Sequence, residues 1–401
     1  MFESVKPVPA DPILGLMEKF RTEQNPNKID LGVGVYKDEQ GRTPVLDSVK
    51  QAEELVHQHE DSKGYIDPAG DAETNLAMQK LLLGEDSQAL KDQRVTTLQT
   101  PGGCGALSLA ARMFAQTNGE STVWVSNPTW GNHLPLIGAA GLEIKEYSYY
   151  DPVSKGVNFD RMMSDLGTAS SGDILLLHGC CHNPSGADLS AGQWQDVALL
   201  MLRKGIVPWV DLAYQGFGEG IEEDCFGLRL LAEQLPEMML ASSCSKNFGL
   251  YRERTGTLSI VTKNSGSGTA VKSQLAKIAR ETYSMPPSHG AAIVGMILGN
   301  QPLRQLWEKE VGEMRWRIGN LRHELALKLN KNAVDRDFSF INEQRGMFSL
   351  LGLSPDQVQK LADDYGIYLV ASSRISVPGI NSTNVDYLAE AIIATLGSGD
   401  T

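Results

Sequence analysis

Hydrophobic residues in the middle of the chain form short continuous runs rather than alternating with polar ones. Six runs have the length and composition of strands buried on both faces: residues 95–100, 122–126, 174–178, 207–211, 238–242 and 257–261. Between several of them, apolar residues recur at helical spacing, at 107–114, 194–202 and 228–235. This alternation of strands and helices predicts an α/β fold with a mostly parallel sheet that helices cover on both faces.

The two ends of the chain predict a second, smaller α/β domain. Asp11 and Pro12 are expected to begin a short helix, and an apolar stripe at about 303–330 predicts a long bridging helix. The C-terminal pattern predicts strands at 338–341 and 347–351, a helix at 355–365, a strand at 368–371 and a final helix after Asn384. We therefore expect an N-terminal segment 1–43 that joins the small domain, a large domain 44–312 and a small domain 313–401.

The composition excludes several classes of protein. With 401 residues, 41% of them hydrophobic and 21% charged, the chain is globular rather than disordered. A net charge of −13 makes nucleic acid an unfavourable partner. Five cysteines without C-x-x-C spacing predict neither disulfides nor a metal site. The apolar runs are too short to cross a bilayer and no export signal is visible, so we expect a cytoplasmic protein that makes no membrane contact.

Polar or glycine-rich segments follow five of the predicted strands. They are TPGGCG at 100–105, NPTW at 127–130, HNPSG at 182–186, DLAY at 211–214 and SSCSK at 242–246. Because open α/β sheets bind ligands beyond the carboxyl ends of their strands, these segments predict one shared crevice. The glycine turn offers backbone N–H groups to a phosphate, although a tight strand–helix turn alone also explains it. It is neither a Walker loop nor a dinucleotide fingerprint.

Four residues of these segments suggest chemistry on a flat, nitrogen-containing ring. Lys246 follows an apolar strand, and a partly desolvated lysine readily forms a Schiff base, whereas an isolated loop lysine is usually solvated. Asp211 ends another strand, where a buried carboxylate pairs with a protonated pyridine nitrogen or caps the next helix. Tyr214 and Trp130 are suited to contacting such a ring, or to ordinary packing at its edge.

Three arginines stand alone in apolar or small-residue surroundings: Arg254, Arg280 and Arg374. The planar guanidinium group suits bidentate recognition of a carboxylate or a phosphate. For any one of them, a surface salt bridge is the commoner use. The arginines therefore indicate an anionic substrate only in combination with the segments described above.

Taken together, the segments resemble the class I aspartate and aromatic amino acid aminotransferases. SSCSKNFGLYRER at 242–254 is similar to the lysine segment with which that family binds pyridoxal 5′-phosphate. Similar matches occur, in the same order, in ADPILGL at 10–16, DLGVGVY at 30–36, VSNPTW at 125–130, HGCCHNPSG at 178–186 and DLAYQGF at 211–217. The resemblance implies a fold type I transferase, a pyridoxal phosphate cofactor, amino acid and 2-oxo acid substrates, and a homodimer with shared active sites.

The resemblance also implies a role for each candidate residue. Lys246 would bind the cofactor as an aldimine and shuttle the substrate proton, while Asp211, supported by His133, would keep the pyridine nitrogen protonated. The cofactor would further contact Gly103, Cys104, Trp130, Asn183, Tyr214, Ser243, Arg254 and, from the neighbouring subunit, Tyr65. The substrate would contact Gly34, Trp130 and Asn183, its α-carboxylate Arg374, and its distal carboxylate Arg280 of the neighbouring subunit.

The predicted reaction is reversible ping-pong amino transfer from L-aspartate to 2-oxoglutarate. The alternative is an aromatic amino acid aminotransferase or an enzyme of dual specificity, because Cys104, Gly64 and Met285 depart from the family pattern. The chain resembles the aspartate branch of the family at three positions, Val35, Lys37 and Thr43. Rival functions are β-elimination or decarboxylation on the same cofactor, and non-covalent binding of a sugar or nucleotide, for which Lys246 would be dispensable.

Overall fold

The computed structural model describes residues 2–7, 12–333 and 336–397. The chain folds into two compact units, which we call the larger and the smaller unit. The larger unit consists of Pro44–Asn183 and Ala187–Trp316; the smaller unit consists of Met1–Thr43, Pro184–Gly186 and Arg317–Thr401. Asp11, the predicted cap of the first helix, lies outside the described residues.

A seven-stranded sheet forms the centre of the larger unit, in the order β2-β10-β9-β8-β7-β3-β4. Its strands are β2 (Val95–Pro101), β3 (Thr122–Asn127), β4 (Glu143–Ser148), β7 (Ile174–His178), β8 (Val207–Leu212), β9 (Met238–Ser243) and β10 (Thr255–Val261). Only β10 runs antiparallel to its neighbours within this sheet. The structure thus confirms the predicted α/β fold. β4 is an additional strand that was not predicted, because its side chains are largely polar and exposed and form no apolar run.

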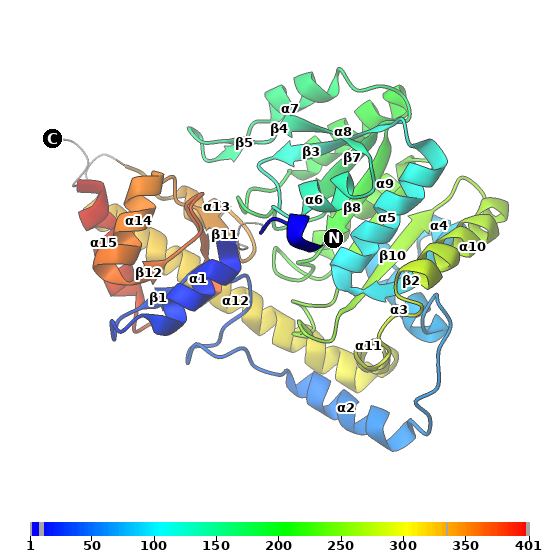
Figure 1. The fold of residues 1–401 in the computed structure, drawn as a ribbon, viewed down its shortest axis with the longest axis horizontal. Coiled ribbons are helices and arrows are strands. Elements are labelled where there is room, and N and C mark those ends of the chain that lie inside the picture. The colour runs from blue at the N-terminus through cyan, green and yellow to red at the C-terminus, as the bar shows by residue number, and fades with distance from the viewer. Residues whose placement is uncertain (1, 8–11, 334–335, 398–401) are drawn as a thin grey trace. The chain divides into compact units, whose positions relative to one another are not determined.

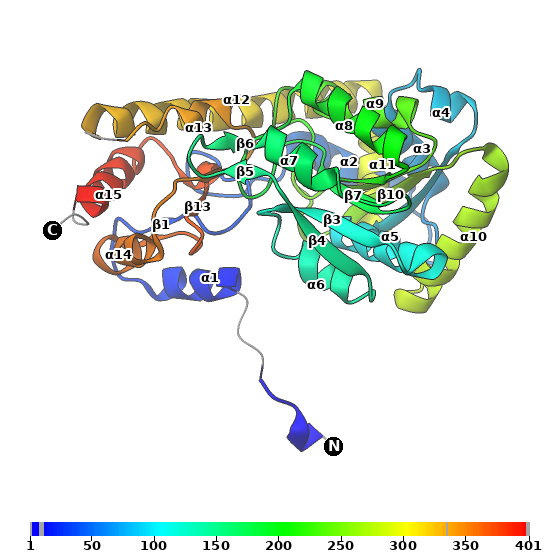
Figure 2. The same ribbon diagram turned by 90° about the horizontal axis from the view of Figure 1, so that it is seen from above.

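Helices cover both faces of this sheet (Figure 2). On one face lie α5 (Gly102–Asn118) and α10 (Ser265–Thr282); on the other lie α7 (Phe159–Leu166), α8 (Ala191–Lys204) and α9 (Phe226–Gln234). The core between sheet and helices includes Leu109 of α5 and Trp209 of β8, both fully buried. α8 has clear sequence limits, because Ser190 and Gln193 form a capping box and Gly205 ends the helix with φ 69°.

The remaining helices of the larger unit flank the sheet. They are α2 (Asp47–His59), α3 (Ala72–Leu83), α4 (Gln88–Lys91), α6 (His133–Gly138) and α11 (His289–Gly299), and α2 packs beside α11 (Figure 1). The predicted long helix is α12 (Gln301–Asn332). Trp307, Val311, Leu321 and Leu325 of its apolar stripe are buried. The first half of α12 belongs to the larger unit and the second half, from Arg317, to the smaller one.

The smaller unit contains two short sheets and several helices. β1 (Ile29–Asp30) pairs in parallel with β12 (Ile367–Tyr368), and β11 (Phe348–Leu350) pairs antiparallel with β13 (Arg374–Ser376). Its helices are α1 (Pro12–Thr22), α13 (Phe340–Glu343), α14 (Pro355–Tyr365) and α15 (Val385–Gly397). In α1, the apolar side chains of Leu14 and Met17 are 63% and 45% exposed.

One predicted strand of the smaller unit is wrong, and a second is shorter than predicted. Residues 338–341 lead into α13, and the N–H of Ile341 donates to the carbonyl of Phe338. Phe338 and Ile341 are nevertheless buried, so a helical turn satisfies the same apolar pattern. The strand predicted at 368–371 is limited to β12, and β13 was not predicted.

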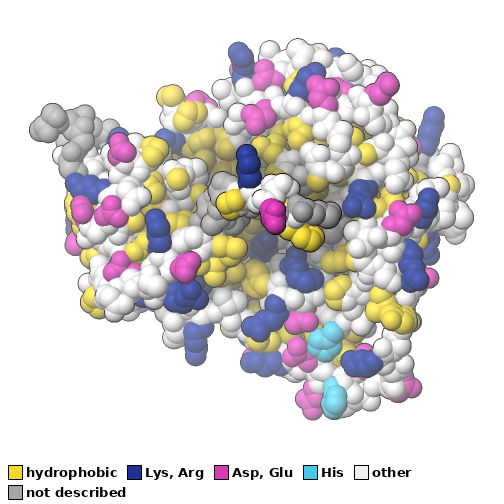
Figure 3. Space-filling model, in the orientation of Figure 1, with side chains coloured by type: hydrophobic (Ala, Val, Ile, Leu, Met, Phe, Trp, Pro, Cys, Tyr) yellow, Lys and Arg dark blue, Asp and Glu magenta, His cyan; other side chains and the backbone are white. Residues whose placement is uncertain are grey.

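Acidic and basic side chains are interspersed on the face of the protein that Figure 3 shows. No helix within the described ranges combines the length and the apolar character that a membrane span requires.

Candidate active site

The candidate site of the larger unit is built where neighbouring parallel strands end. In the sheet register, His178 at the end of β7 stands opposite Asp211 near the end of β8, and Asp211 stands opposite Ala241 of β9. The segments that follow β3, β7, β8 and β9 therefore start from adjacent positions along one edge of the sheet, as predicted from the sequence. Each of these strands is almost wholly buried, which fixes the positions of the residues at their ends.

Asp211 is buried and hydrogen-bonded to a histidine. It is 8% exposed, and its Oδ2 lies 3.1 Å from Nε2 of His133, which begins α6 and is fully buried. Burial alone would raise the pKa of Asp211, but the His133 hydrogen bond and the positive charges nearby, including Lys246, hold this pKa below its usual value. Asp211 is therefore an anion whose free oxygen can pair with a buried cationic group.

Two further residues, for which the sequence predicts no role, extend this contact. Thr129 Oγ1 lies 2.8 Å from Nδ1 of His133 and 3.1 Å from Nε2 of His178, so it links the two imidazoles. Burial and the neighbouring His133 lower the pKa of His178 to about 3, which keeps this ring neutral. The position of His178 at the end of a predicted strand beside that of Asp211 was the available signal.

A second histidine lies behind His178. The two rings are 4.3 Å apart, and His182 stacks on Tyr149 with 4.1 Å between ring centroids. Nε2 of His182 lies 2.9 Å from Oγ of Ser126, and burial lowers the pKa of His182 well below its usual value. The row of rings behind Asp211 is therefore densely packed, and it is neutral at His178 and His182.

Lys246 is placed beside an aromatic ring near this row. It follows β9, is half-buried, and its Nζ lies 4.9 Å from the ring centroid of Tyr214. Tyr214 and Asn183 are each 6% exposed. The structure thus brings Lys246, Tyr214 and Asp211 to one region, because the positive charge of Lys246 also contributes to the low pKa of Asp211.

Trp130 lies at the entrance to α6. Its ring is half-buried and meets that of His133 edge-on, with 5.3 Å between centroids. A bound flat ring that paired with Asp211 would therefore have an aromatic side chain close by on which to stack.

The glycine turn forms a cradle at the start of α5. Gly102 has φ 69°, and a Cβ at this position would lie 2.7 Å from Nη2 of Arg254. A Cβ at Gly103 would lie 3.1 Å from Cβ of Ser243, so the turn packs directly against the two side chains predicted to bind phosphate. Cys104 is half-buried in the first turn of α5, and its Sγ is 3.7 Å from Nδ2 of Asn132. The backbone N–H groups at the start of α5, a hydroxyl and a guanidinium group thus lie close together, and such donors are suited to an anion.

Tyr65 and Arg280 stay outside this group. Tyr65 is 93% exposed, and Arg280 is an exposed residue of α10 whose Nη1 donates to Oγ of Ser284 over 2.9 Å. The segment of Tyr65 is tied to the end of α10, because the Ile66 N–H lies 3.2 Å from Sδ of Met285. Two of the departures from the family pattern, the exposed Gly64 and the half-buried Met285, therefore lie in one region of the larger unit.

The smaller unit holds the third predicted arginine. Arg374 begins β13 and is 6% exposed; its guanidinium carbon lies 4.3 Å from the ring centroid of Phe348, and Nη2 donates to the carbonyl of Gly32 over 2.7 Å. Gly34 packs on the same ring, since a Cβ there would lie 2.8 Å from Cζ of Phe348. Arg374 and Gly34 thus share one aromatic platform.

The vicinal cysteines are buried beside Asp224. The side-chain ligand atoms of Cys180, Cys181 and Asp224 lie within 4.8 Å of one another. The carboxylate of Asp224 already accepts the backbone N–H groups of Gly216, Gly218, Glu219 and Gly220. The neighbouring thiol of Cys181 and burial raise the pKa of Cys180, so the Cys180 thiol stays protonated. The two cysteines therefore pack against the turn that Asp224 holds.

Comparison with known proteins gives the family. Residues 26–392 match the model of aminotransferase class I and II. The chain is 47% identical to the aspartate aminotransferase of Escherichia coli, over 99% of this chain and 100% of that protein, and 45% identical to the aromatic-amino-acid aminotransferase of Pseudomonas aeruginosa, over 98% of each. It superimposes with a TM-score of 0.97 on the aromatic-amino-acid aminotransferase of Burkholderia pseudomallei covalently bound to pyridoxal phosphate, at 44% identity and 99% coverage of both chains. With its lysine, aspartate and glycine turn in the arrangement described above, the chain belongs to the aminotransferase class I and II family.

Proposed function

We propose that this protein catalyses reversible amino transfer between L-aspartate and 2-oxoglutarate, giving oxaloacetate and L-glutamate, with pyridoxal 5′-phosphate as cofactor. The observation that carries the proposal is the grouping of Lys246, Tyr214 and the anionic Asp211 beside a cradle for phosphate. Amino acids and 2-oxo acids are the substrates of this family, and relatives of similar identity act on aspartate or on aromatic amino acids.

The residues present fit this cofactor. The turn at Gly102 and Gly103, with Ser243 and Arg254 packed against it, suits a phosphate group. Asp211 offers a buried carboxylate of low pKa to a protonated ring nitrogen, and Trp130 offers a face for stacking. Asn183 and Tyr214 are buried polar residues on the segments after β7 and β8, suited to hydrogen-bonding the ring's phenolic oxygen. When bound, pyridoxal phosphate supplies a sink for the electron pair left at the substrate Cα.

The chain's own residues then carry the proton and hold the charges. Lys246 Nζ acts as the base that takes the proton from the substrate Cα and returns it during the reverse reaction. His133, oriented by Thr129 and the neutral His178, stabilises the Asp211 carboxylate from behind. Tyr214, whose ring lies against Lys246, restricts the positions that Nζ can adopt.

Two arginines bind the substrate carboxylates in this proposal. Arg374 binds the α-carboxylate of every substrate, and Arg280 of the neighbouring subunit binds the distal carboxylate of dicarboxylic substrates. Aromatic amino acids are a second class of donor. Met285 favours this breadth, because its flexible thioether lies in the exposed region that also carries Arg280.

The working form in this proposal is a homodimer with shared sites, located in the cytoplasm. Tyr65 is 93% exposed on its own chain. A second subunit whose phosphate it contacts would reconcile this exposure with the role that the family resemblance implies. The five cysteines are free thiols, which is typical of a reducing compartment.

The first test is a visible spectrum of the holoenzyme titrated separately with L-aspartate and L-phenylalanine. We expect each donor to convert the bound cofactor to its amine form, with aspartate half-saturating at the lower concentration. A preference for phenylalanine would move the enzyme to the aromatic branch. A protein that takes up no pyridoxal phosphate would contradict the catalytic proposal as a whole.

Shared sites are tested by mixing two inactive variants after unfolding and refolding them together. In a dimer of Lys246→Ala with Arg280→Ala, one of the two sites keeps both residues only if Arg280 acts across the interface. Random mixing should then restore about one quarter of the wild-type aspartate activity. Activity that stays at the level of the separate variants would show that Arg280 serves its own chain.

A further inference from the structure

Arg374 is oriented by groups of the smaller unit itself. The ring of Phe348 lies against one face of its guanidinium group, and the carbonyl of Gly32 accepts from Nη2 over 2.7 Å. Bidentate binding of a carboxylate depends on the plane of the guanidinium group as well as on its charge. The position of the Gly32 carbonyl therefore helps to set the plane of the Arg374 guanidinium group.

The backbone at Gly32 is held by a side chain rather than by the sheet. Leu31 is still bonded on both sides, to the carbonyl of Tyr368 and the N–H of Ser376. One residue later, the N–H of Gly32 donates to Oδ1 of Asp30 over 3.0 Å. The orientation of the Leu31–Gly32 peptide thus depends on where the Asp30 carboxylate is fixed, and the next peptide, which carries the Gly32 carbonyl, is joined to it at the Gly32 Cα.

The Asp30 carboxylate is in turn fixed by an ion pair with little solvent access. Its Oδ2 lies 2.9 Å from Nζ of Lys37, and the two side chains are 11% and 18% exposed. Removing one partner of such a pair leaves a poorly solvated charge that must seek another contact. A change at Lys37 is therefore expected to release Asp30 from the Gly32 N–H.

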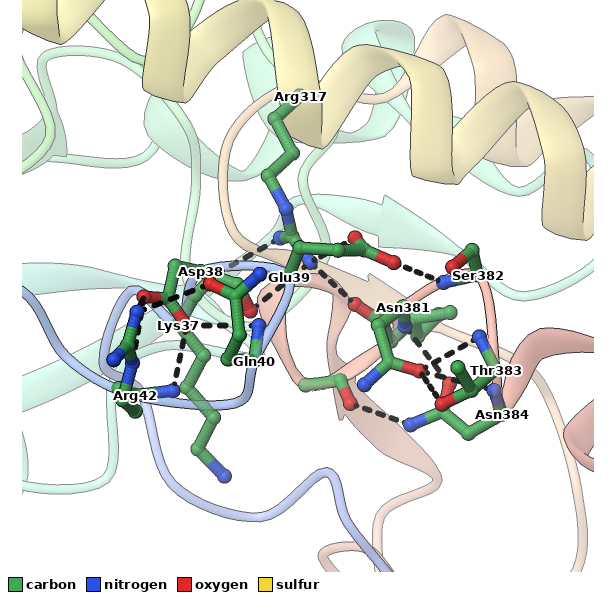
Figure 4. Close-up of polar contacts among 12 residues, drawn as sticks. Lys37, Asp38, Glu39, Gln40, Arg42, Arg317, Asn381, Ser382, Thr383 and Asn384 are labelled. Atoms are coloured by element: carbon green, nitrogen blue, oxygen red, sulfur yellow. Dashed lines mark hydrogen bonds and ion pairs between the residues drawn. The ribbon is translucent and has the colours of Figure 1, made fainter.

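Lys37 is anchored through its own backbone. Arg317 reaches from α12 and donates from Nη1 to the carbonyl of Lys37 over 2.8 Å and from Nη2 to the carbonyl of Ile380 over 2.9 Å (Figure 4). Glu39 pairs with Arg317 over 3.2 Å and accepts the Ser382 N–H over 2.7 Å. The hydrogen bond from Ser382 and, to a smaller extent, the contact with Arg317 keep the pKa of the Glu39 carboxyl below its usual value. The segment between Asp30 and Glu39 is thus held at both ends.

We propose that the Asp30–Lys37 ion pair positions Arg374 for the substrate α-carboxylate, acting through the backbone on the two sides of Gly32. This inference rests on the proposed role of Arg374. Asp30 and Lys37 are positioning residues in this account, because the contacts described above run from them to Gly32 and only from there to the arginine. Since every amino acid and 2-oxo acid substrate carries the α-carboxylate, the ion pair affects all of them alike and does not choose among side chains.

The test uses Lys37→Met in the holoenzyme, with propionate as a monocarboxylate probe in calorimetric titration. We expect the dissociation constant of propionate and the KM values of aspartate and phenylalanine to rise together by about tenfold, with the half-reaction rate at saturation unchanged within about twofold. A loss confined to one donor, or unchanged propionate binding, overturns the proposal. Arg42→Met is the matched control, because Arg42 pairs with Asp38 in the same segment and is 72% exposed; we expect wild-type values.

Two further variants separate the ion pair from general damage. Asp30→Asn keeps an oxygen that can accept the Gly32 N–H but loses the charge, so it should match Lys37→Met; wild-type propionate binding in it would overturn the role of the charge. Lys37→Arg keeps the charge and should restore most of the affinity if the Lys37→Met loss has this cause. A Lys37→Arg variant as weak as Lys37→Met contradicts the proposal.

A double-mutant cycle tests whether the ion pair acts through Arg374. On an Arg374→Ala background, Lys37→Met should cause no further loss of propionate binding. Equal losses on both backgrounds overturn the inference and leave the proposed function intact. If Arg374→Ala itself leaves propionate binding unchanged, the failure belongs to the proposed role of Arg374 and not to the ion pair alone.

Discussion

Two regions of the larger unit that are assigned to the same reaction differ sharply in their surroundings. Asp211, His133 and Tyr214 are buried, and the hydrogen bond between the first two and the ring contact between Tyr214 and Lys246 both lie within one chain. Tyr65 and Arg280 are exposed, on segments joined through Met285. The residues that surround the proposed base Lys246 are thus in the interior, whereas Tyr65 and Arg280, which are proposed to contact the phosphate and the distal carboxylate in the neighbouring subunit, are on the surface.

The difference shows how one fold keeps a reaction while its substrates vary. Substitution of a buried, hydrogen-bonded residue leaves unpaired polar atoms and changes packing, so the interior group resists change. An exposed residue can be replaced at little cost in stability, because it has few partners to lose. Relatives of similar identity are named for aspartate and for aromatic amino acids.

The largest expected effect comes from the interior group. Lys246→Ala should lower kcat by at least about 10,000-fold for aspartate and phenylalanine alike, because the base that moves the Cα proton is removed. Steady-state assays with both donors and the visible spectrum of the variant measure the effect. Retained turnover would favour a non-covalent binding function and remove the contrast between the two regions.

A change in the exposed region should instead separate the donors. Arg280→Ala is expected to reduce kcat/KM for aspartate by about 100- to 1,000-fold, since a charged partner of the distal carboxylate is lost. For phenylalanine the loss should stay below about tenfold, because that side chain has no carboxylate. Half-reaction kinetics with each donor give the two ratios, and equal losses would place Arg280 with the shared machinery.

Acid should act mainly on the interior. The pKa of His178 is lowered from 6.5 to about 3, so below pH 6.5 the unfolded chain binds a proton that the folded chain does not. Stability is therefore lost as pH falls, by about 1.4 kcal/mol for each pH unit until the folded pKa is reached. Urea unfolding between pH 7 and pH 4 should show a shallower dependence in His178→Asn.

A histidine on the surface provides the control for that series. His289 is 46% exposed and lies 3.9 Å from Glu53. His289→Asn should leave the pH dependence of stability as in the wild type. If both variants show the same slope as the wild type, the acid sensitivity arises elsewhere and His178 is not the neutral buried group described here.

The smallest effect is expected at the phosphate cradle. Cys104→Ser should change the affinity for pyridoxal phosphate by less than about twofold, because the backbone turn, Ser243 and Arg254 remain to bind the phosphate. Equilibrium dialysis or reconstitution of the apoenzyme measures this affinity. A large gain would show that the side chain at this position, and not the turn, limits phosphate binding.

Much of the fold could be predicted from the sequence because parallel strands that are buried on both faces consist of continuous runs of apolar residues. The edge strand β4 could not, since most of its side chains are polar and exposed or only half-buried. The segment 338–341 was misassigned because four residues with alternating apolar side chains fit a strand and a helical turn equally well. β13 was missed because it has three residues and begins with an arginine.

In the candidate site, too, some features could be predicted from the sequence and others could not. Lys246, Asp211 and the glycine turn follow predicted strands, so their proximity could be expected from topology. The link from His133 through Thr129 to His178 depends on side-chain directions and on the register of β7 against β8, which no local pattern reports. The Asp30–Lys37 pair likewise depends on how a short loop folds back on itself.

The parallel register that sets His178 opposite Asp211 also limits how this family's genes can change length. Because side chains alternate between the two faces of a strand, one codon lost inside β7 or β8 would turn the residue at the strand's end to the opposite face. Selection would remove such deletions, whereas the turns at the amino ends of the parallel strands can change length without moving these residues. Length variation among natural relatives should therefore be concentrated in those turns.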